Sequence, residues 1–276
     1  MKTKFLLAFL LISLTAAGAP KIKTQHFEVK DSIRLFEKED PQGIGYKSVK
    51  SVVVDWPVLV NGKKSRQLND FLVEKVFLAS QNKKSFPTIP GDIEGLKKCV
   101  RHMVDSELRG SEMVSDYIVK EPSTPGVPDV DAEEYPMNRW YESCELKHSH
   151  DVGDLVFFVE NLEMYLGGAH GDYAANFYAF DVALNKPIHL ADIVTSPRKL
   201  LRLLPRYDNR DKDNKWWDNV DVKSIENFFV KDGKMVFVFS PYAIGPFCDG
   251  IVEVPVPLKT LKAKGLLTAY GKKLMK

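Results

Sequence analysis

Four side chains in the middle of the sequence carry groups from which an acid–base pair or a metal site could be built. His170 follows two glycines at the expected end of a strand, where a loop would present it. Asp172, His189 and Asp192 are near enough along the chain to approach it, and an imidazole beside a carboxylate can exchange a proton or hold a cation. The competing interpretation, which we favour, is a histidine that ties its loop to backbone carbonyls, because no recognised ligand spacing links these residues.

Two further histidines form a pair at His148 and His150. Side chains two residues apart on a regular strand point to the same face, as many metal sites require. This pair falls where a strand runs into a polar turn, and no third ligand is indicated nearby, so we predict surface histidines. The sequence therefore predicts no metal site and no bound cofactor.

The motifs of the common hydrolases and phosphate-binding proteins do not occur in this sequence. It has no Gly-x-Ser-x-Gly turn for a serine nucleophile. Gly167-Gly168 lacks the Gly-Lys-Ser/Thr ending of a phosphate loop. The carboxylates are scattered, so no glycosidase pair can be identified, and we assign no catalytic residue.

Aromatic side chains are the better candidates for a binding surface. Trp216 and Trp217 lie together in the charged segment 208–221, and exposed tryptophans are frequent anchors of protein interfaces. The alternative is that one or both fold back onto the core. Tyr242 and Phe247 flank a proline–glycine loop and either add to the recognition surface or cap the sheet. We predict that these four aromatic residues bind a partner.

The cysteines Cys99, Cys144 and Cys248 are odd in number and far apart. One disulfide would be compatible with export, because exported proteins meet an oxidising compartment. Free buried cysteines are the alternative, and the sequence selects no pair. No two of them have the spacing of metal ligands.

The first 19 residues have the composition of a secretory signal peptide. Lys2 and Lys4 precede the apolar run 5–14, and small residues follow at 15–19. This run is shorter than the roughly 20 apolar residues of a membrane span, and no later segment is long enough. We therefore expect cleavage and a periplasmic or secreted chain without a membrane span.

Charge is balanced once this segment is removed. Loss of Lys2 and Lys4 from the 39 basic residues leaves 37, equal to the 37 acidic residues. A nucleic-acid binder would need a basic excess concentrated on one face, so we expect no nucleic-acid partner. The sequence leaves the oligomeric state open.

Hydrophobic periodicity gives the N-terminal half one strand and two helices. Residues 44–60 are predicted as a strand in which Pro57 marks an edge or a bulge. Residues 64–80 and 92–108 are predicted as amphipathic helices, the second with Asp92 as its N-cap. Residues 121–136 contain four prolines and five acids, which is typical of a surface loop.

The C-terminal half is predicted to be richer in strands. Strands are expected over 139–148, 154–166, 174–183 and 250–256, a hairpin over 227–239, and short helices over 197–204 and 258–264. This order predicts an α+β fold, with antiparallel sheet or sheets, two amphipathic helices in the N-terminal half and one or two short helices in the C-terminal half.

Two stretches far apart in the sequence carry a family resemblance. The first runs from Met164 to Tyr173 and contains the motif Gly167-Gly168-Ala169-His170. The second runs from Phe237 to Pro246 and contains Ser240-Pro241-Tyr242-Ala243-Ile244-Gly245. With the aromatic strand 176–181 between them, they resemble the RsiV-type C-terminal domain, domain of unknown function 3298, which is also found attached to PdaC-type peptidoglycan deacetylases. Residues 48–80 are more loosely similar to the PdaC-like N-terminal half of this RsiV/PdaC-like family.

The resemblance implies an organisation and a function. The signal peptide would occupy residues 1–19, a PdaC-like α+β part residues 20–163, and the RsiV-type α+β domain residues 164–276. RsiV-type domains are implicated in binding lysozyme, and PdaC-type proteins act at peptidoglycan. The resemblance therefore implies an exported, non-catalytic binding module of the bacterial envelope.

Its partner would be a lysozyme-like enzyme, peptidoglycan glycan or another envelope protein. The sequence shows neither an anti-sigma segment nor a deacetylase domain, so sigma-factor control and deacetylation are not carried over. The alternative function is a cell-wall or glycan hydrolase that uses His170 and nearby carboxylates.

Overall fold

The structure is a computed structural model. It describes residues 20–37, 46–78, 90, 92–114, 118–119, 139–166, 169–210 and 215–275. The expected signal segment 1–19, the loop 121–136 and the motif residues Gly167 and Gly168 lie outside the described residues.

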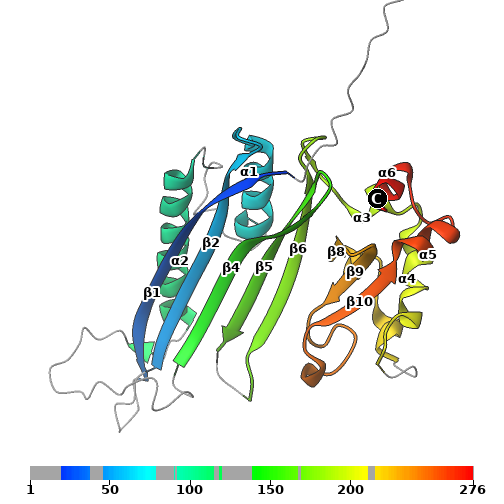
Figure 1. Cartoon of the computed structure of the whole chain (residues 1–276). Helices are drawn as coiled ribbons and strands as arrows, with labels where there is room; N and C mark the ends of the chain where they lie inside the picture. The colour runs from blue at the N-terminus through cyan, green and yellow to red at the C-terminus, as the bar shows by residue number, and fades with distance from the viewer. Residues whose placement is uncertain are drawn as a thin grey trace, which may run out of the picture.

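A large twisted sheet forms the centre of the described part of the chain (Figure 1). Its strands are β1 (Ile22–Glu37), β2 (Tyr46–Val60), β3 (Ile118–Val119), β4 (Arg139–Val152), β5 (Leu155–Tyr165), β6 (Asp172–Asp181) and β7 (Lys186–Pro187). They lie in the order β3-β1-β2-β4-β5-β6-β7. Neighbouring strands are antiparallel except β2 and β4, which run parallel.

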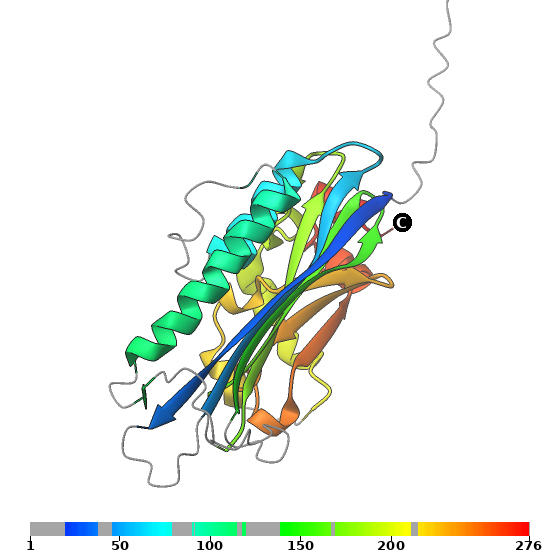
Figure 2. The ribbon, with the colours of Figure 1, turned by 90° about the vertical axis from the view of Figure 1, so that its left-hand side faces the viewer.

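Two helical segments cover one face of this sheet. Helix α1 (Arg66–Leu72) continues as a π-helical segment, η1 (Val73–Leu78), and helix α2 (Ile93–Val114) lies along the strands (Figure 2). Asp92 caps α2 as predicted, since its Oδ1 accepts a hydrogen bond of 2.8 Å from the Gly95 amide. The apolar faces of these helices and of the sheet enclose what we call the N-terminal core.

A small sheet and short helices lie against the opposite face. The small sheet has the order β10-β9-β8, with β8 (Phe228–Lys231), β9 (Lys234–Phe239) and β10 (Val252–Pro257). The α-helices are α3 (Leu190–Ile193), α4 (Pro197–Leu201), α5 (Leu258–Ala263) and α6 (Ala269–Lys273). Short 3₁₀ segments are η4 (Leu204–Arg206), η5 (Lys215–Asn219), η6 (Lys223–Ile225) and η7 (Phe247–Asp249).

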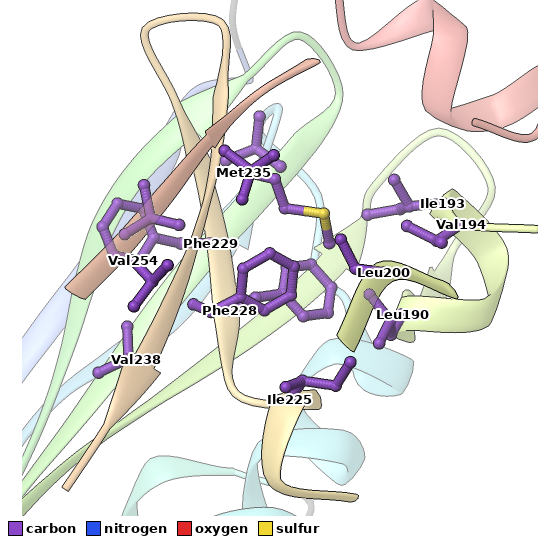
Figure 3. Packing of buried hydrophobic residues seen from close by; sticks show 14 of the residues in the cluster. Leu190, Ile193, Val194, Leu200, Ile225, Phe228, Phe229, Met235, Val238 and Val254 are labelled. Carbon is purple, nitrogen blue, oxygen red and sulfur yellow. The ribbon is translucent and has the colours of Figure 1, made fainter. Parts of the chain in front are cut away.

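Both faces of the small sheet are apolar, and this builds a second core. Phe228 and Met235 lie on the side of the short helices, whereas Phe229 and Val238 lie on the other side (Figure 3). Phe229 packs there on Phe177 of β6, with 4.5 Å between ring centroids. We call the cluster that joins the small sheet, the short helices and strands β5 and β6 the C-terminal core.

Strand β5 belongs to both cores. Leu155 and Phe157 point into the C-terminal core, and Val156 and Phe158 point into the N-terminal core. All four are at most 1% exposed, because successive side chains of a strand point to opposite faces and each face is covered here. This continuous apolar run therefore holds the two parts of the molecule together.

These observations confirm the predicted α+β class and the antiparallel hairpin formed by β8 and β9. The C-terminal half has more short α-helices than the one or two expected. At Pro57 the register of β1 against β2 skips Val58, so the proline sits beside a bulge, where its missing amide donor is tolerated. Residue 163, where the first part was expected to end, lies inside β5, and the sheet continues through β6.

Candidate functional site

A group of four rings, two of them exposed and two half-buried, forms where the large sheet meets the small sheet. His170 comes from the connection before β6, Tyr173 lies near the start of β6, and Tyr242 and Phe247 come from the segment between β9 and β10. We call these four residues the aromatic cluster. The structure thus brings together the two motif stretches that the sequence places far apart.

The rings of the aromatic cluster are in direct contact. His170 stacks on Phe247, with 3.8 Å between centroids and 19° between planes. Tyr173 meets the same Phe247 ring edge-on at 5.5 Å, and Tyr242 lies 5.7 Å from it. Phe247 is therefore the central ring, and each of the other three rings is its neighbour.

Hydrogen bonds fix the orientation of the histidine. The Nδ1 of His170 lies 2.8 Å from the Gly171 carbonyl oxygen, and Nε2 lies 3.1 Å from the Tyr242 hydroxyl. A carbonyl only accepts, so Nδ1 carries a hydrogen, and Nε2 lies within hydrogen-bond distance of the tyrosine hydroxyl. The contact with a backbone carbonyl is the one expected for a loop-tying histidine, and the tyrosine bond links the two loops.

Tyr242 is presented to solvent by an uncommon backbone. Its φ is +66°, in the left-handed region that non-glycine residues seldom occupy, and its side chain is 52% exposed. Strain of this kind is typical of functional sites, where the surrounding structure has to hold it. The exposed ring and the strained backbone together favour a recognition role for Tyr242.

Behind the aromatic cluster, a network of polar side chains holds the β9–β10 loop. Arg210 donates from Nε and Nη2 to Asp208, at 2.9 and 2.8 Å, and from Nη1 to Asp249 at 2.6 Å. Its Nη2 also donates to the Ile244 carbonyl at 3.0 Å. Trp217 donates from its indole to Asp208 at 2.9 Å. We call Asp208, Arg210, Trp217 and Asp249 the Arg210 network.

Asp208 is the anchor of the Arg210 network. Its side chain is only 3% exposed, and burial by itself raises the pKa of a carboxyl group. Hydrogen bonds from Arg210 and Trp217 more than offset this effect, so the pKa of Asp208 lies below its ordinary value. The carboxylate is therefore ionised at neutral pH, and it orients both of its donors.

The two tryptophans have different environments. Trp217 is partly buried, bonds Asp208 and meets Phe239 edge-on at 5.4 Å. Trp216 is 40% exposed. The structure therefore places Trp217 as a supporting residue and leaves Trp216 as the more accessible of the pair. Binding by either tryptophan stays a prediction.

The other polar residues considered beside His170 are engaged elsewhere. Asp192 accepts from the His189 backbone amide at 2.9 Å, at the start of α3, and forms an ion pair of 2.8 Å with Lys186. Burial raises the pKa of Asp192, but the bonds from Lys186 and His189 outweigh it and hold the pKa below its usual value. Asp172 accepts from the Tyr173 amide at 2.9 Å.

The pair His148 and His150 does not share a face, although simple alternation predicts that it would. A register irregularity at Ser149 pairs His148 with Phe158 and His150 with Phe157, which belong to the N-terminal and the C-terminal core respectively. His148 bonds Asp151 at 2.7 Å, and His150 donates from Nε2 to the Val230 carbonyl at 2.8 Å. The bulge thus turns His150 into a link between the two sheets.

Among the described residues, no group of three or more His, Cys, Asp or Glu side chains is arranged to hold a metal ion. Cys99, Cys144 and Cys248 are free. Burial, followed by the neighbouring Glu160, raises the pKa of the Cys144 thiol, which disfavours a reactive thiolate.

In the part of the chain that the structure describes, none of the helices has the length and apolar character that crossing a membrane demands.

Sequence reasoning did not find Tyr173, Asp208, Arg210 or Asp249 as parts of this site. Arg210 and Asp249 are 39 residues apart, and charged residues are common in both surrounding segments. One signal was available at Gly245. A Cβ built there would collide with the Arg210 guanidinium and the Asp249 carboxylate, so a glycine in a proline-rich loop indicates something packed closely against the backbone.

This close approach predicts the effect of a single methyl group. We expect Gly245→Ala to lower the free energy of unfolding by about 1–3 kcal/mol, because the added carbon forces the ion pair or the loop to move. Urea denaturation of the variant and the wild type measures this change.

The same substitution in an Asp249→Ala background is the control. If the added methyl group clashes with the ion pair, Gly245→Ala destabilises the Asp249→Ala variant less than it destabilises the wild type. The double-mutant cycle then gives a coupling of at least about 0.5 kcal/mol. Equal costs in both backgrounds would place the constraint elsewhere in the loop.

Comparison with known proteins gives the fold a family context. Residues 194–259 match the model of a family described as "Protein of unknown function (DUF3298)". This confirms the domain of unknown function 3298 that the sequence motifs indicate, over a shorter range than the predicted 164–276. No curated protein matches the chain.

Solved structures resemble nearly the whole chain. A crystal structure of a DUF3298 family member from Bacteroides fragilis NCTC 9343 superimposes with a TM-score of 0.60 and 18% identity, covering 93% of this chain and 99% of that one. A DUF3298 family protein from Pseudomonas aeruginosa PAO1 does so with a TM-score of 0.51 and 15% identity, covering 91% and 96%. At these identities the likeness shows the fold alone.

Proposed function

We propose that this chain is an exported, non-catalytic binding module of the bacterial cell envelope, and that the aromatic cluster is its partner-facing surface. The observation that carries this proposal is the exposed Tyr242 ring, held over Phe247 and His170 on a strained backbone. Aromatic side chains dominate the energetics of protein interfaces, and an ordered aromatic group loses little conformational freedom when it binds.

The composition of the cluster supports binding over catalysis. The hydrogen-bonding partners of His170 are a carbonyl oxygen and a tyrosine hydroxyl, whereas an acid–base site of the glycosidase kind needs two carboxyl groups beside the scissile bond. The Asp192 carboxylate is held by Lys186 and the start of α3. The cell-envelope location rests on the signal-like residues 1–19, and N-terminal sequencing of the mature protein would contradict it by finding Met1.

The partner class follows from the resemblance to RsiV-type and PdaC-type proteins. We propose a cell-wall-related partner, namely a lysozyme-like enzyme, peptidoglycan glycan or another envelope protein. Calorimetric titration of the mature chain with purified lysozyme, and co-sedimentation with peptidoglycan sacculi, test the first two directly.

We expect saturable binding to one of these probes, with no release of soluble sugar from the sacculi. If the wild type released reducing ends and His170→Ala abolished this release, the binding-module proposal would be wrong and the hydrolase alternative would be supported. Absence of binding to both probes would leave the third class, another envelope protein, which crosslinking in intact cells would have to capture through Tyr242.

A further inference from the structure

A groove between the segment 199–206 and the residues that follow α5 is lined by positive charge. Its volume is about 380 Å³. The lining residues are Lys199, Arg202, Leu203, Arg206, Lys264 and Leu266. We call this the basic groove. The two leucines are buried and the four cationic side chains are exposed, so the charges surround an apolar floor.

The basic groove is built from two segments that contain no acidic residue. Residues 194–207 and 254–275 have neither Asp nor Glu. Backbone hydrogen bonds join these segments: the Thr195 amide donates to the Leu266 carbonyl at 2.9 Å, and the Thr268 amide donates to the Ile193 carbonyl at 2.9 Å. The fold therefore brings two basic stretches together in a chain that is balanced as a whole.

The acids that flank the first segment are already paired. Asp192 binds Lys186, and Asp208 binds Arg210, each at 2.8 Å. Within the described residues, none of the four cationic side chains of the basic groove forms an ion pair. Lys50 shows the contrast, because it lies 2.8 Å from both Glu107 and Glu142.

Four cations around one groove repel each other, and a bound anion would relieve this repulsion. The planar guanidinium groups of Arg202 and Arg206 match the oxygens of a phosphate group, on which each can form two parallel hydrogen bonds. The groove volume is within the usual range for small-molecule sites. A phosphate-bearing ligand concentrates several negative charges in such a volume, whereas carboxylates spread the same charge over more atoms.

We infer that the basic groove binds a ligand carrying phosphate groups, either free in solution or as the headgroup of an anionic lipid. This site is separate from the aromatic cluster and uses none of its residues. The inference can therefore be tested independently of the proposed envelope partner.

Calorimetry with inorganic pyrophosphate tests the phosphate chemistry. We expect Arg202→Gln with Arg206→Gln to weaken pyrophosphate binding at least about tenfold, since each lost charge-assisted hydrogen bond is among the stronger kinds. Lys63→Gln with Lys64→Gln removes the same charge from an exposed turn before α1 and is the matched control. It should bind as the wild type does.

Citrate at equal ionic strength distinguishes phosphate recognition from simple charge attraction. Binding of citrate as tightly as pyrophosphate, or equal losses in the two double variants, would overturn the inference. Circular dichroism melting should show both variants folded, because all four substituted side chains are exposed.

Vesicles distinguish the two sources of phosphate. The mature protein is sedimented with phosphatidylcholine vesicles and with vesicles of equal parts phosphatidylcholine and phosphatidylglycerol. Sedimentation with the anionic vesicles alone, lost in the arginine double variant, supports a lipid headgroup. Binding of pyrophosphate without vesicle binding supports a free ligand, and binding of neither probe refutes the site.

Discussion

Replacing Asp208 by alanine is expected to lower the free energy of unfolding by about 3 kcal/mol. The substitution removes a buried carboxylate that accepts bonds from Arg210 and from the Trp217 indole. The Trp217 indole would then lose its acceptor, and Arg210 would keep only Asp249 and the Ile244 carbonyl. Removing one side of a buried, hydrogen-bonded pair is strongly destabilising. Urea denaturation at neutral pH gives the change in free energy.

Two comparisons separate this explanation from a general loss of charge. Asp218→Ala removes an exposed carboxylate from η5, in the same segment of the chain, and should change the stability by less than about 0.5 kcal/mol. Similar losses in the two variants would contradict the anchoring role of Asp208.

The second comparison uses pH. Because the folded-state pKa of Asp208 is below its ordinary value of 3.8, the ionised group contributes stability that is present above that pH. This contribution is lost as the pH falls through the folded-state pKa. The difference between wild type and Asp208→Ala should therefore shrink in acid, and a difference that grew in acid would contradict the assignment.

Removing the central ring of the aromatic cluster, Phe247, together with the exposed Tyr242 ring is expected to weaken partner binding at least about thirtyfold, or roughly 2 kcal/mol. The variant combines Phe247→Ala with Tyr242→Asn. Asparagine is chosen at position 242 because it tolerates the positive φ of that residue better than alanine does. Titration with whichever of lysozyme or sacculi binds the wild type measures the effect.

The control for this variant is Leu184→Ala. Leu184 is 55% exposed, in the turn between β6 and β7, so the substitution removes exposed apolar surface away from the aromatic cluster. It should leave binding unchanged. Trp216→Ala, with Trp217 kept in place, tests whether the neighbouring segment adds a second contact. A folded cluster variant that bound normally would move the interface away from these rings.

The elements that periodicity predicts are those whose burial repeats along a single segment. Residues 92–108 place an apolar residue on one helical face at each turn, and the structure has α2 there. The hairpin of β8 and β9 is equally local, since its turn contains Asp232-Gly233 with both φ angles positive. Strand β1 was not predicted, because only a few of its side chains, such as Phe27 and Val29, are buried and its apolar pattern is therefore weak.

The site was predicted in part, for a related reason. The site includes Tyr242, Phe247 and His170, whose residue types are typical of binding or catalytic sites. The family resemblance associates the two stretches that contain them. Stacking of His170 on Phe247 depends on how the small sheet docks on β6, which no local pattern encodes. The environment of Trp217 likewise depends on Asp208, whose burial comes only with the folded loop.

The dual burial of β5 has a consequence for how the molecule unfolds. Leu155 and Phe157 serve one core while Val156 and Phe158 serve the other, so neither core can open without exposing one face of the same strand. We infer one cooperative transition in which the amides of β5 are among the slowest to exchange with solvent. A fragment restricted to residues 194–259 would lack this strand and should not hold its structure in isolation.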